Sequence, residues 1–311
     1  MPMKPDFISL NPQSALPELF SKQVEPAWTQ NWRDFYRLDF KPSNIEQRLG
    51  RMKVLNYQLA VHYFIPQRAV ATLIVLHGYY DHMGLYGHLF RWALKNNFAV
   101  LSCDLPGHGL STGARASISE FSEYQAVLAA LFEVAQQLSL PAPWHLAGQS
   151  MGGAIALDYA LNQQPLSEIG RLILFAPLVR PRAWRQSKLL YQSLRPFVKQ
   201  VPRQRTNNST DKDFVEFLQR DPLQANVLPT AWVGALSRWI PQIEKAQAKK
   251  VSPIIIQGDG DQTVDWQHNL NVLEDKFKQP ELCILPGAGH HLVNEQAHYR
   301  QQEFSFIERF L

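Results

Sequence analysis

Residues 144–160 read WHLAGQSMGGAIALDYA, and this stretch indicates the fold more clearly than any other part of the chain. A short run leads to Gly148, Ser150 and Gly152 in the pattern G-x-S-x-G, and an apolar segment of helical character follows. We expect a strand, a tight turn and a helix in that order. Glycines flanking the serine remove side chains that would clash in such a turn, which exposes the hydroxyl at the strand's carboxyl end. Ser150 is therefore a candidate nucleophile.

The segments on either side of this stretch alternate between predicted strands and predicted helices. Buried strands are predicted at residues 71–76, 98–105, 172–176, 252–258 and 281–286, and helices at 86–95, 119–139 and from about 293 to 311. Such alternation is typical of a parallel sheet covered by helices on both faces. Residues 51–64 alternate apolar and polar side chains, which predicts one or two antiparallel strands at an edge of the sheet.

The alternation is interrupted between residues 178 and about 250, where helical segments but no clear strand are expected. We interpret this interruption as an inserted helical cap. The predicted organisation is an irregular N-terminal arm at 1–48 that packs on the core, a core at 49–177 and 246–311, and a cap at 178–245.

Composition narrows the class of protein. The chain has 311 residues, of which 45% are hydrophobic and 19% charged, as expected of a single large α/β domain with an insertion. No apolar run approaches the roughly 18 residues that span a bilayer, and the N-terminus lacks the features of a signal peptide, so a cytoplasmic location is expected. Cys103 and Cys283 lie in strand-like runs, where free thiols are expected.

Cofactors, metals and nucleic acid are not indicated. The sequence lacks a phosphate-binding G-x-G-x-x-G or G-x-x-x-x-G-K-[ST] motif after a strand. His82 and His88 have no H-E-x-x-H context or cysteine pair that would suggest zinc. A net charge of +4 is too modest to suggest binding to nucleic acid.

A serine nucleophile needs a histidine base, and the base needs a third group to hold its tautomer. In sheet proteins of this kind the acid and the histidine follow the serine, each after a later strand. The strand at 252–258 ends in DGDQTVD (259–265), and the strand at 281–286 ends in GAGHH (287–291). Turn formation or helix capping accounts for most aspartates in such a loop, and only one of the tandem histidines can face the serine. The choice within each loop therefore stays open at this point.

An oxyanion hole needs two backbone amides that converge on the developing negative charge. The residue after the nucleophile, Met151, supplies one of them. The loop after the strand at 71–76 supplies the other, and Tyr79, which follows His77-Gly78, is the expected donor.

With these residues the chain resembles the α/β-hydrolase superfamily, within it the branch of monoacylglycerol lipases and bacterial lysophospholipases. The resemblance runs from about residue 70 to the C-terminus and implies a mostly parallel sheet, helices on both faces and an inserted helical cap. It implies that Asp261 is the acid and His290 the base. The motifs that carry it are HGxxxHxxxY (77–86), DxxGHGxS (104–111), GQSMGG (148–153), DPL (221–223), QGxxD (257–261) and GxxHxxxNE (287–295).

The leading hypothesis is a serine hydrolase that cleaves the acyl ester of a lysophospholipid or monoacylglycerol through an acyl-enzyme. The alternatives are a carboxylesterase on small esters, a serine aminopeptidase on the same fold, or a non-catalytic binding protein. A dehalogenase would have Asp at position 150 and is excluded by Ser150. The apolar content of the cap favours a long acyl chain.

The cap also carries a concentration of positive charge. Between residues 178 and 240 there are eleven basic and four acidic residues, a net charge of +7, interleaved with aromatic and leucine side chains. Basic residues beside an anionic bilayer contribute about 1 kcal/mol each. The alternative is that these charges only keep an apolar insertion in solution. We therefore expect a lipid or ester substrate, and peripheral contact of the cap with the inner face of an anionic membrane.

Overall fold

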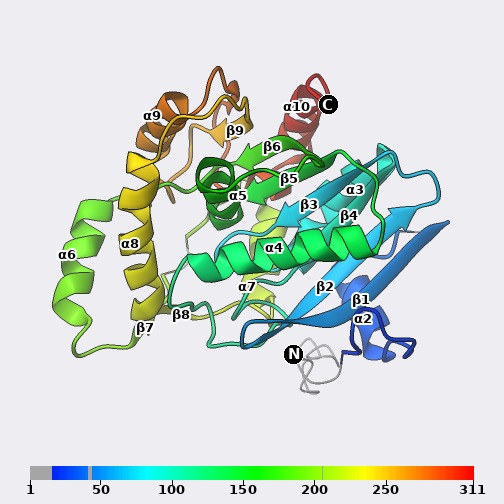
Figure 1. The fold of residues 1–311 in the computed structure, drawn as a ribbon. Helices are drawn as coiled ribbons and strands as arrows, with labels where there is room; N and C mark the ends of the chain where they lie inside the picture. Colours follow the sequence, from blue (N-terminus) through cyan, green and yellow to red (C-terminus); the bar gives the residue numbers. More distant parts are fainter. Residues whose placement is uncertain (1–15, 41–43, 205) are drawn as a thin grey trace.

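The computed structural model describes residues 16–40, 44–204 and 206–311. The parts of the predicted arm at 1–15 and 41–43, and Arg205 of the cap, lie outside the described residues. An eight-stranded sheet in the order β1-β2-β4-β3-β5-β6-β9-β10 runs through the molecule (Figure 1). Its strands are β1 (Ile45–Val54), β2 (Tyr57–Pro66), β3 (Ala71–Leu76), β4 (Phe98–Cys103), β5 (Trp144–Gln149), β6 (Ile169–Phe175), β9 (Ile254–Gly258) and β10 (Glu281–Leu285).

All neighbouring strands from β4 to β10 pair in parallel, while β1 pairs with β2 and β2 with β4 in antiparallel fashion. The predicted mostly parallel sheet with an antiparallel edge is therefore confirmed. In parallel strands the carboxyl ends all reach one edge of the sheet, which is where ligands bind in open α/β sheets.

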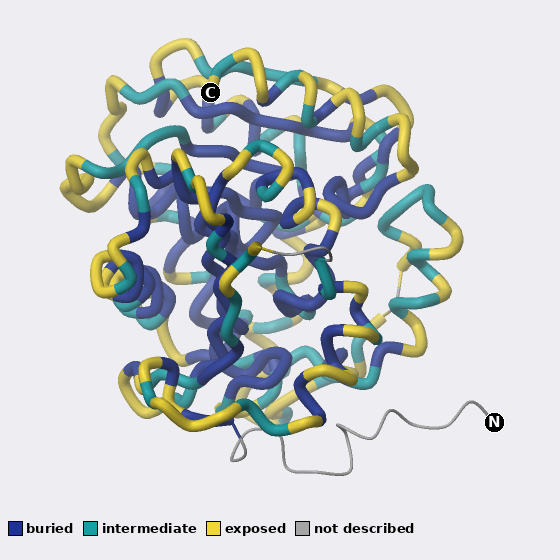
Figure 2. Tube along the Cα trace, turned by 90° about the vertical axis from the view of Figure 1, so that its right-hand side faces the viewer, coloured by how far each residue is buried: buried dark blue, intermediate teal, exposed yellow. Residues whose placement is uncertain are grey.

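Helices cover both faces of the sheet, as expected from side chains that alternate along each strand. On β3, Ile74 and Leu76 belong to one apolar cluster, which also contains residues of α4, α5, α8 and α9. Leu73 and Val75 belong to a second cluster with residues of α2, α3 and α10. The helices are α2 (Trp28–Phe35), α3 (Gly87–Lys95), α4 (Ser122–Gln137), α5 (Met151–Asn162), α8 (Thr230–Lys245), α9 (Trp266–Lys276) and α10 (Ala297–Ile307). Buried segments fill the middle of the molecule and exposed ones its periphery (Figure 2).

The N-terminal arm differs from the expectation in two respects. It contains a helix, α2, whose Trp32 is fully buried in the second cluster. Trp28 and Trp32, two of the aromatic residues of the predicted irregular arm, therefore lie on one buried helical face. The predicted boundary at residue 48 also falls inside β1.

Between β6 and β9 the main sheet gains no strand, and the chain forms α6 (Trp184–Leu194), α7 (Lys212–Arg220) and α8. The expectation that this segment lacks strands was wrong, because β7 (Gln200–Pro202) and β8 (Val227–Pro229) form a small antiparallel pair. Strands of three residues are too short to show an alternating pattern. The division of the chain into core and cap remains a prediction, and we use "the cap" for residues 178–245.

No helix in the described part of the chain is both long and apolar enough to cross a membrane. Cys103 and Cys283 are both free, the first buried and the second half-buried. The free thiols expected from the sequence are thus confirmed.

Candidate active site

Ser150 lies on the turn between β5 and α5 in a strained backbone conformation. Its φ and ψ are 53° and −109°, a region that residues with a side chain rarely adopt. The turn depends on close approach of the backbone at Gly152, where an added Cβ would lie 2.0 Å from the carbonyl oxygen of Leu76. The strained turn projects the Ser150 side chain from the carboxyl edge of the sheet, where 8% of the residue is exposed.

The acid and histidine loops meet at the same edge. Asp261 follows β9 and His290 follows β10, and His290 Nδ1–H donates a hydrogen bond of 2.6 Å to Asp261 Oδ2. The other oxygen of Asp261 accepts from the backbone N–H groups of Thr263 at 2.7 Å and Val264 at 3.1 Å. Both side chains are almost fully buried. The structure thus brings together the two residues that the resemblance selected from their loops.

The electrostatics of this pair favour an ionised acid. Burial alone would raise the pKa of Asp261, but the neighbouring His290 and the donated backbone N–H groups outweigh it and lower that pKa below its usual value. An ionised carboxylate is the form that accepts the Nδ1–H bond and fixes the histidine tautomer.

A buried glutamine connects the turn that carries Ser150 to the loop that carries His290. Gln149, the residue before Ser150, donates from Nε2 to the backbone carbonyl of His290 at 2.8 Å. Among the described residues no hydrogen bond joins the Ser150 hydroxyl to the His290 ring. Bonds of this kind often tighten only when substrate binds.

The two predicted oxyanion donors lie on loops that touch. The loop after β3 packs against the start of α5, since the Cβ position of Gly152 is 2.0 Å from the Leu76 oxygen and 2.9 Å from that of His77. Among the described residues, neither the N–H of Tyr79 nor that of Met151 has a hydrogen-bond acceptor. Two unpaired backbone donors on touching loops are compatible with the predicted oxyanion hole.

The remaining candidates have structural contacts. Asp265 forms an ion pair with Arg180 at 2.6 Å, and Asp259 accepts from the N–H of Gly287. His291 Nε2 lies 3.0 Å from Asp81 Oδ2, and both side chains are buried. Burial alone would raise the pKa of Asp81, but His291 overcomes this and keeps it below its usual value.

One set of buried side-chain contacts could not be predicted from the sequence, because it joins three distant parts of the chain. His82 Nε2 lies 2.8 Å from Asp221 Oδ2, and Tyr36 donates its hydroxyl to Asp221 Oδ1 at 2.7 Å. Burial alone would lower the pKa of His82, but Asp221 overcomes this and raises it. Asp221 of the cap thus ties the loop after β3, through His82, to Tyr36, the residue that follows α2. Within the described residues no group of three or more potential metal ligands was found.

Comparison with known proteins identifies the family to which the chain belongs. A model of the family described as serine aminopeptidase, S33, matches residues 67–297. The chain belongs to this family, within the α/β-hydrolase superfamily.

Its relatives are consistent with the lipase branch that the sequence motifs suggested. The chain is 27% identical to phospholipase YtpA of Bacillus subtilis over 243 residues, 73% of this chain and 90% of the relative. It is 26% identical to monoglyceride lipase of Rattus norvegicus over 234 residues, 73% of this chain and 77% of the relative. A soluble variant of monoglyceride lipase from Saccharomyces cerevisiae, solved with a substrate analog, superposes with a TM-score of 0.74 at 17% identity. The superposition covers 87% of this chain and 96% of that one.

Proposed function

We propose that this chain is a carboxylic ester hydrolase that cleaves the acyl ester of a single-chain polar lipid, a lysophospholipid or a monoacylglycerol. The observation that carries the proposal is the buried 2.6 Å bond between His290 and Asp261 at the sheet edge where Ser150 occupies its strained turn. The names of the relatives, phospholipase and monoglyceride lipase, support the lipid ester over other substrates.

In this mechanism Ser150 Oγ attacks the acyl carbonyl carbon while His290 Nε2 takes the hydroxyl proton. The N–H groups of Tyr79 and Met151 donate to the oxyanion of the tetrahedral intermediate. His290 then gives the proton to the departing alcohol, which leaves an ester on Ser150. Water attacks that ester with the same base, and the fatty acid is released.

The substrate class is tested by fatty-acid release from monoacylglycerol, lysophosphatidylcholine, lysophosphatidylglycerol and short p-nitrophenyl esters. An aminoacyl p-nitroanilide tests the peptidase activity that the family description names. The proposal predicts the highest kcat/KM on a long-chain lipid ester. A higher value on the short esters or on the anilide would contradict it.

Asp261→Asn should reduce kcat by about 10⁴-fold, the loss typical of a serine triad with an uncharged third member. The Asn oxygen is expected to face the Thr263 and Val264 amides, so its NH₂ group would point at His290 Nδ1. Nδ1 would then be the acceptor, and the protonated Nε2 could not take the serine proton. Steady-state kinetics of this variant beside Asp259→Asn and Asp265→Asn checks the assignment. A comparable loss in either control would move the acid to that residue.

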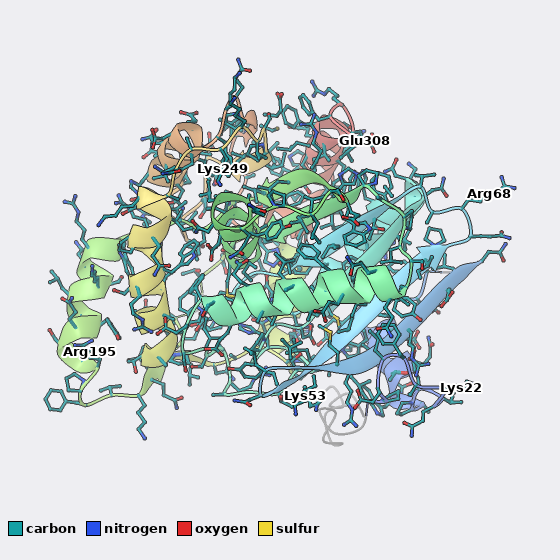
Figure 3. All side chains as sticks on the ribbon, viewed as in Figure 1. Lys22, Lys53, Arg68, Arg195, Lys249 and Glu308 are labelled. Carbon is teal, nitrogen blue, oxygen red and sulfur yellow. The ribbon has the colours of Figure 1, made fainter. Side chains whose placement is uncertain are left out.

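The predicted membrane contact gains support from α6. The apolar side chains of the cap fall into two groups, of which those on α8, including Trp232 and Trp239, are buried against the core. By contrast, Leu189, Leu190 and Phe197 are 66%, 61% and 86% exposed. The chain has no acidic residue from 178 to 210, and α6 stands at the outer edge of the molecule with Arg195 near its end (Figure 3). Exposed apolar and basic side chains on one helix are typical of interfacial helices.

We expect wild-type protein to sediment with anionic vesicles in a salt-sensitive manner and only weakly with zwitterionic ones. Reversal of Arg182, Arg185 and Lys188 to Glu should weaken binding by at least on the order of 100-fold, because loss of three basic residues alone removes about 3 kcal/mol and the new carboxylates repel the anionic surface.

The matched control reverses Lys53, Arg68 and Lys249, which are exposed and lie away from α6 (Figure 3). Equal losses in the two triple variants would show that only net charge matters. Vesicle binding that depends neither on lipid charge nor on salt concentration would contradict the proposed membrane contact.

A further inference from the structure

Glu295, at the end of the loop that carries His290, is fully buried although it bears a carboxylate. We call residues 286–295 the histidine loop and residues 208–210 of the cap the anchor segment. Burial of a carboxylate requires hydrogen bonds to its oxygens. Each of the hydrogen bonds that the Glu295 carboxylate accepts comes from one of these two segments.

The two oxygens of Glu295 face different segments. Oε1 accepts from the backbone N–H of Gly289 at 2.7 Å, within the histidine loop. Oε2 accepts from the backbone N–H of Thr210 at 2.8 Å, from the Thr210 hydroxyl, and from the Ser209 hydroxyl at 3.2 Å. One carboxylate therefore bridges the anchor segment and the residue that precedes His290.

A second contact joins the same two segments. The backbone carbonyl of Asn208 accepts from the N–H of His290 at 2.9 Å and from the N–H of His291 at 2.7 Å. The single proton of the Ser209 hydroxyl is shared between Glu295 Oε2 and the carbonyl of Asn294, which lies at the shorter distance of 2.9 Å. The backbone of His290 is thus held by a segment of the cap, in addition to the bond of its ring with Asp261.

We propose that Glu295 is a positioning residue that clamps the anchor segment onto the histidine loop and so fixes His290 against Asp261. This inference rests on the proposed function, in which His290 is the base. Its physical basis is that every group facing the carboxylate is a donor, so only a group that accepts on both sides fits. Loosening the anchor segment would therefore release the base.

Glu295→Gln is the direct test, because its NH₂ group must face either the N–H of Gly289 or the donors of Thr210 and Ser209. We expect kcat to fall by on the order of 100-fold, the loss that follows from a displacement of about 1 Å, with KM little changed. Thr210→Val removes the hydroxyl that donates to Glu295 but keeps the backbone N–H, so we expect kcat to fall less than in Glu295→Gln. The double variant should lose less than the product of the two single losses, because both act on one contact.

The matched control is Glu303→Gln. Glu303 is equally buried, but neither of its oxygens has a hydrogen-bond partner among the described residues. Burial raises the pKa of Glu303 well above its usual value, which favours the neutral acid, and an amide of the same shape can replace that form. We expect wild-type kcat in this variant.

A readout that does not depend on turnover is the proton NMR signal of His290 Nδ1–H, which a short bond to Asp261 shifts far downfield. The signal should be present in wild type and Glu303→Gln and lost or shifted in Glu295→Gln. Wild-type kcat and an unchanged signal in Glu295→Gln would overturn the clamp. If Glu295→Gln does not fold, Thr210→Val with wild-type kcat and signal would overturn it.

Failure of the proposed function can be distinguished from failure of the clamp. If the proposed function is wrong, wild-type protein does not react with a fluorophosphonate, whatever the NMR signal shows. If wild type reacts and Glu295→Gln reacts at the same rate, only the clamp fails.

Discussion

Ser150→Ala is expected to abolish ester hydrolysis, with kcat reduced by about 10⁶-fold as in a subtilisin-type triad. The variant keeps the His290–Asp261 pair and the free donors of Tyr79 and Met151, so residual rate would come from the oxyanion hole and binding alone. The measurement is steady-state release of fatty acid from the best substrate of the panel.

The fold should survive this substitution. The Ser150 side chain makes no capping bond to α5, so its removal breaks no contact that holds the helix. Ser187→Ala, on the exposed surface of α6, is the matched control and should keep wild-type kcat. Hydrolysis by Ser150→Ala within tenfold of wild type, with the melting temperature unchanged, would contradict the role of Ser150.

His290→Ala is expected to lower kcat about as far as loss of the serine, because base and nucleophile act as one unit. His291→Ala should keep most of the activity. Its ring contacts Asp81 and packs on Phe214 with ring centroids 4.8 Å apart, whereas the ring of His290 bonds Asp261.

The two histidine variants should also differ in stability. His291→Ala removes the imidazole that lies 3.0 Å from the buried carboxylate of Asp81, so we expect a lower melting temperature with kcat per folded molecule retained. Thermal unfolding measured beside the kinetics separates the two effects. Full activity in His290→Ala together with loss in His291→Ala would move the base by one residue.

The sequence predicted the main sheet and the loops of the candidate site because those signals are local. Ser150 is marked by glycines two residues away on each side, and the acid and histidine loops directly follow apolar strands. The choice of Asp261 over its neighbours came from the family resemblance, since turn aspartates look alike in sequence.

The contacts between the cap and the core were beyond sequence reasoning. His82 meets Asp221 across 139 residues, Tyr36 meets Asp221 across 185, and Thr210 meets Glu295 across 85. The periodicity of apolar residues in a helix or strand gives no information about contacts between residues so far apart in the chain. The motif residues Asp221 and Glu295 were visible in the sequence, but only the structure shows that each links the cap to the loops around the site.

The sequence also did not show which apolar residues of the cap are buried and which are exposed. Trp239 lies in the core, where its Nε1–H donates to Asp158 at 3.1 Å, whereas Leu189 is exposed on α6. Both read as apolar positions of a helix, and only packing against the core distinguishes them.

The most direct test of the central claim, that Ser150 is the nucleophile, is mass spectrometry of the protein after reaction with a fluorophosphonate. We expect one adduct per chain, located by peptide mapping on Ser150 and absent from Ser150→Ala and His290→Ala. An adduct on any other residue, or an adduct that persists in Ser150→Ala, would contradict it.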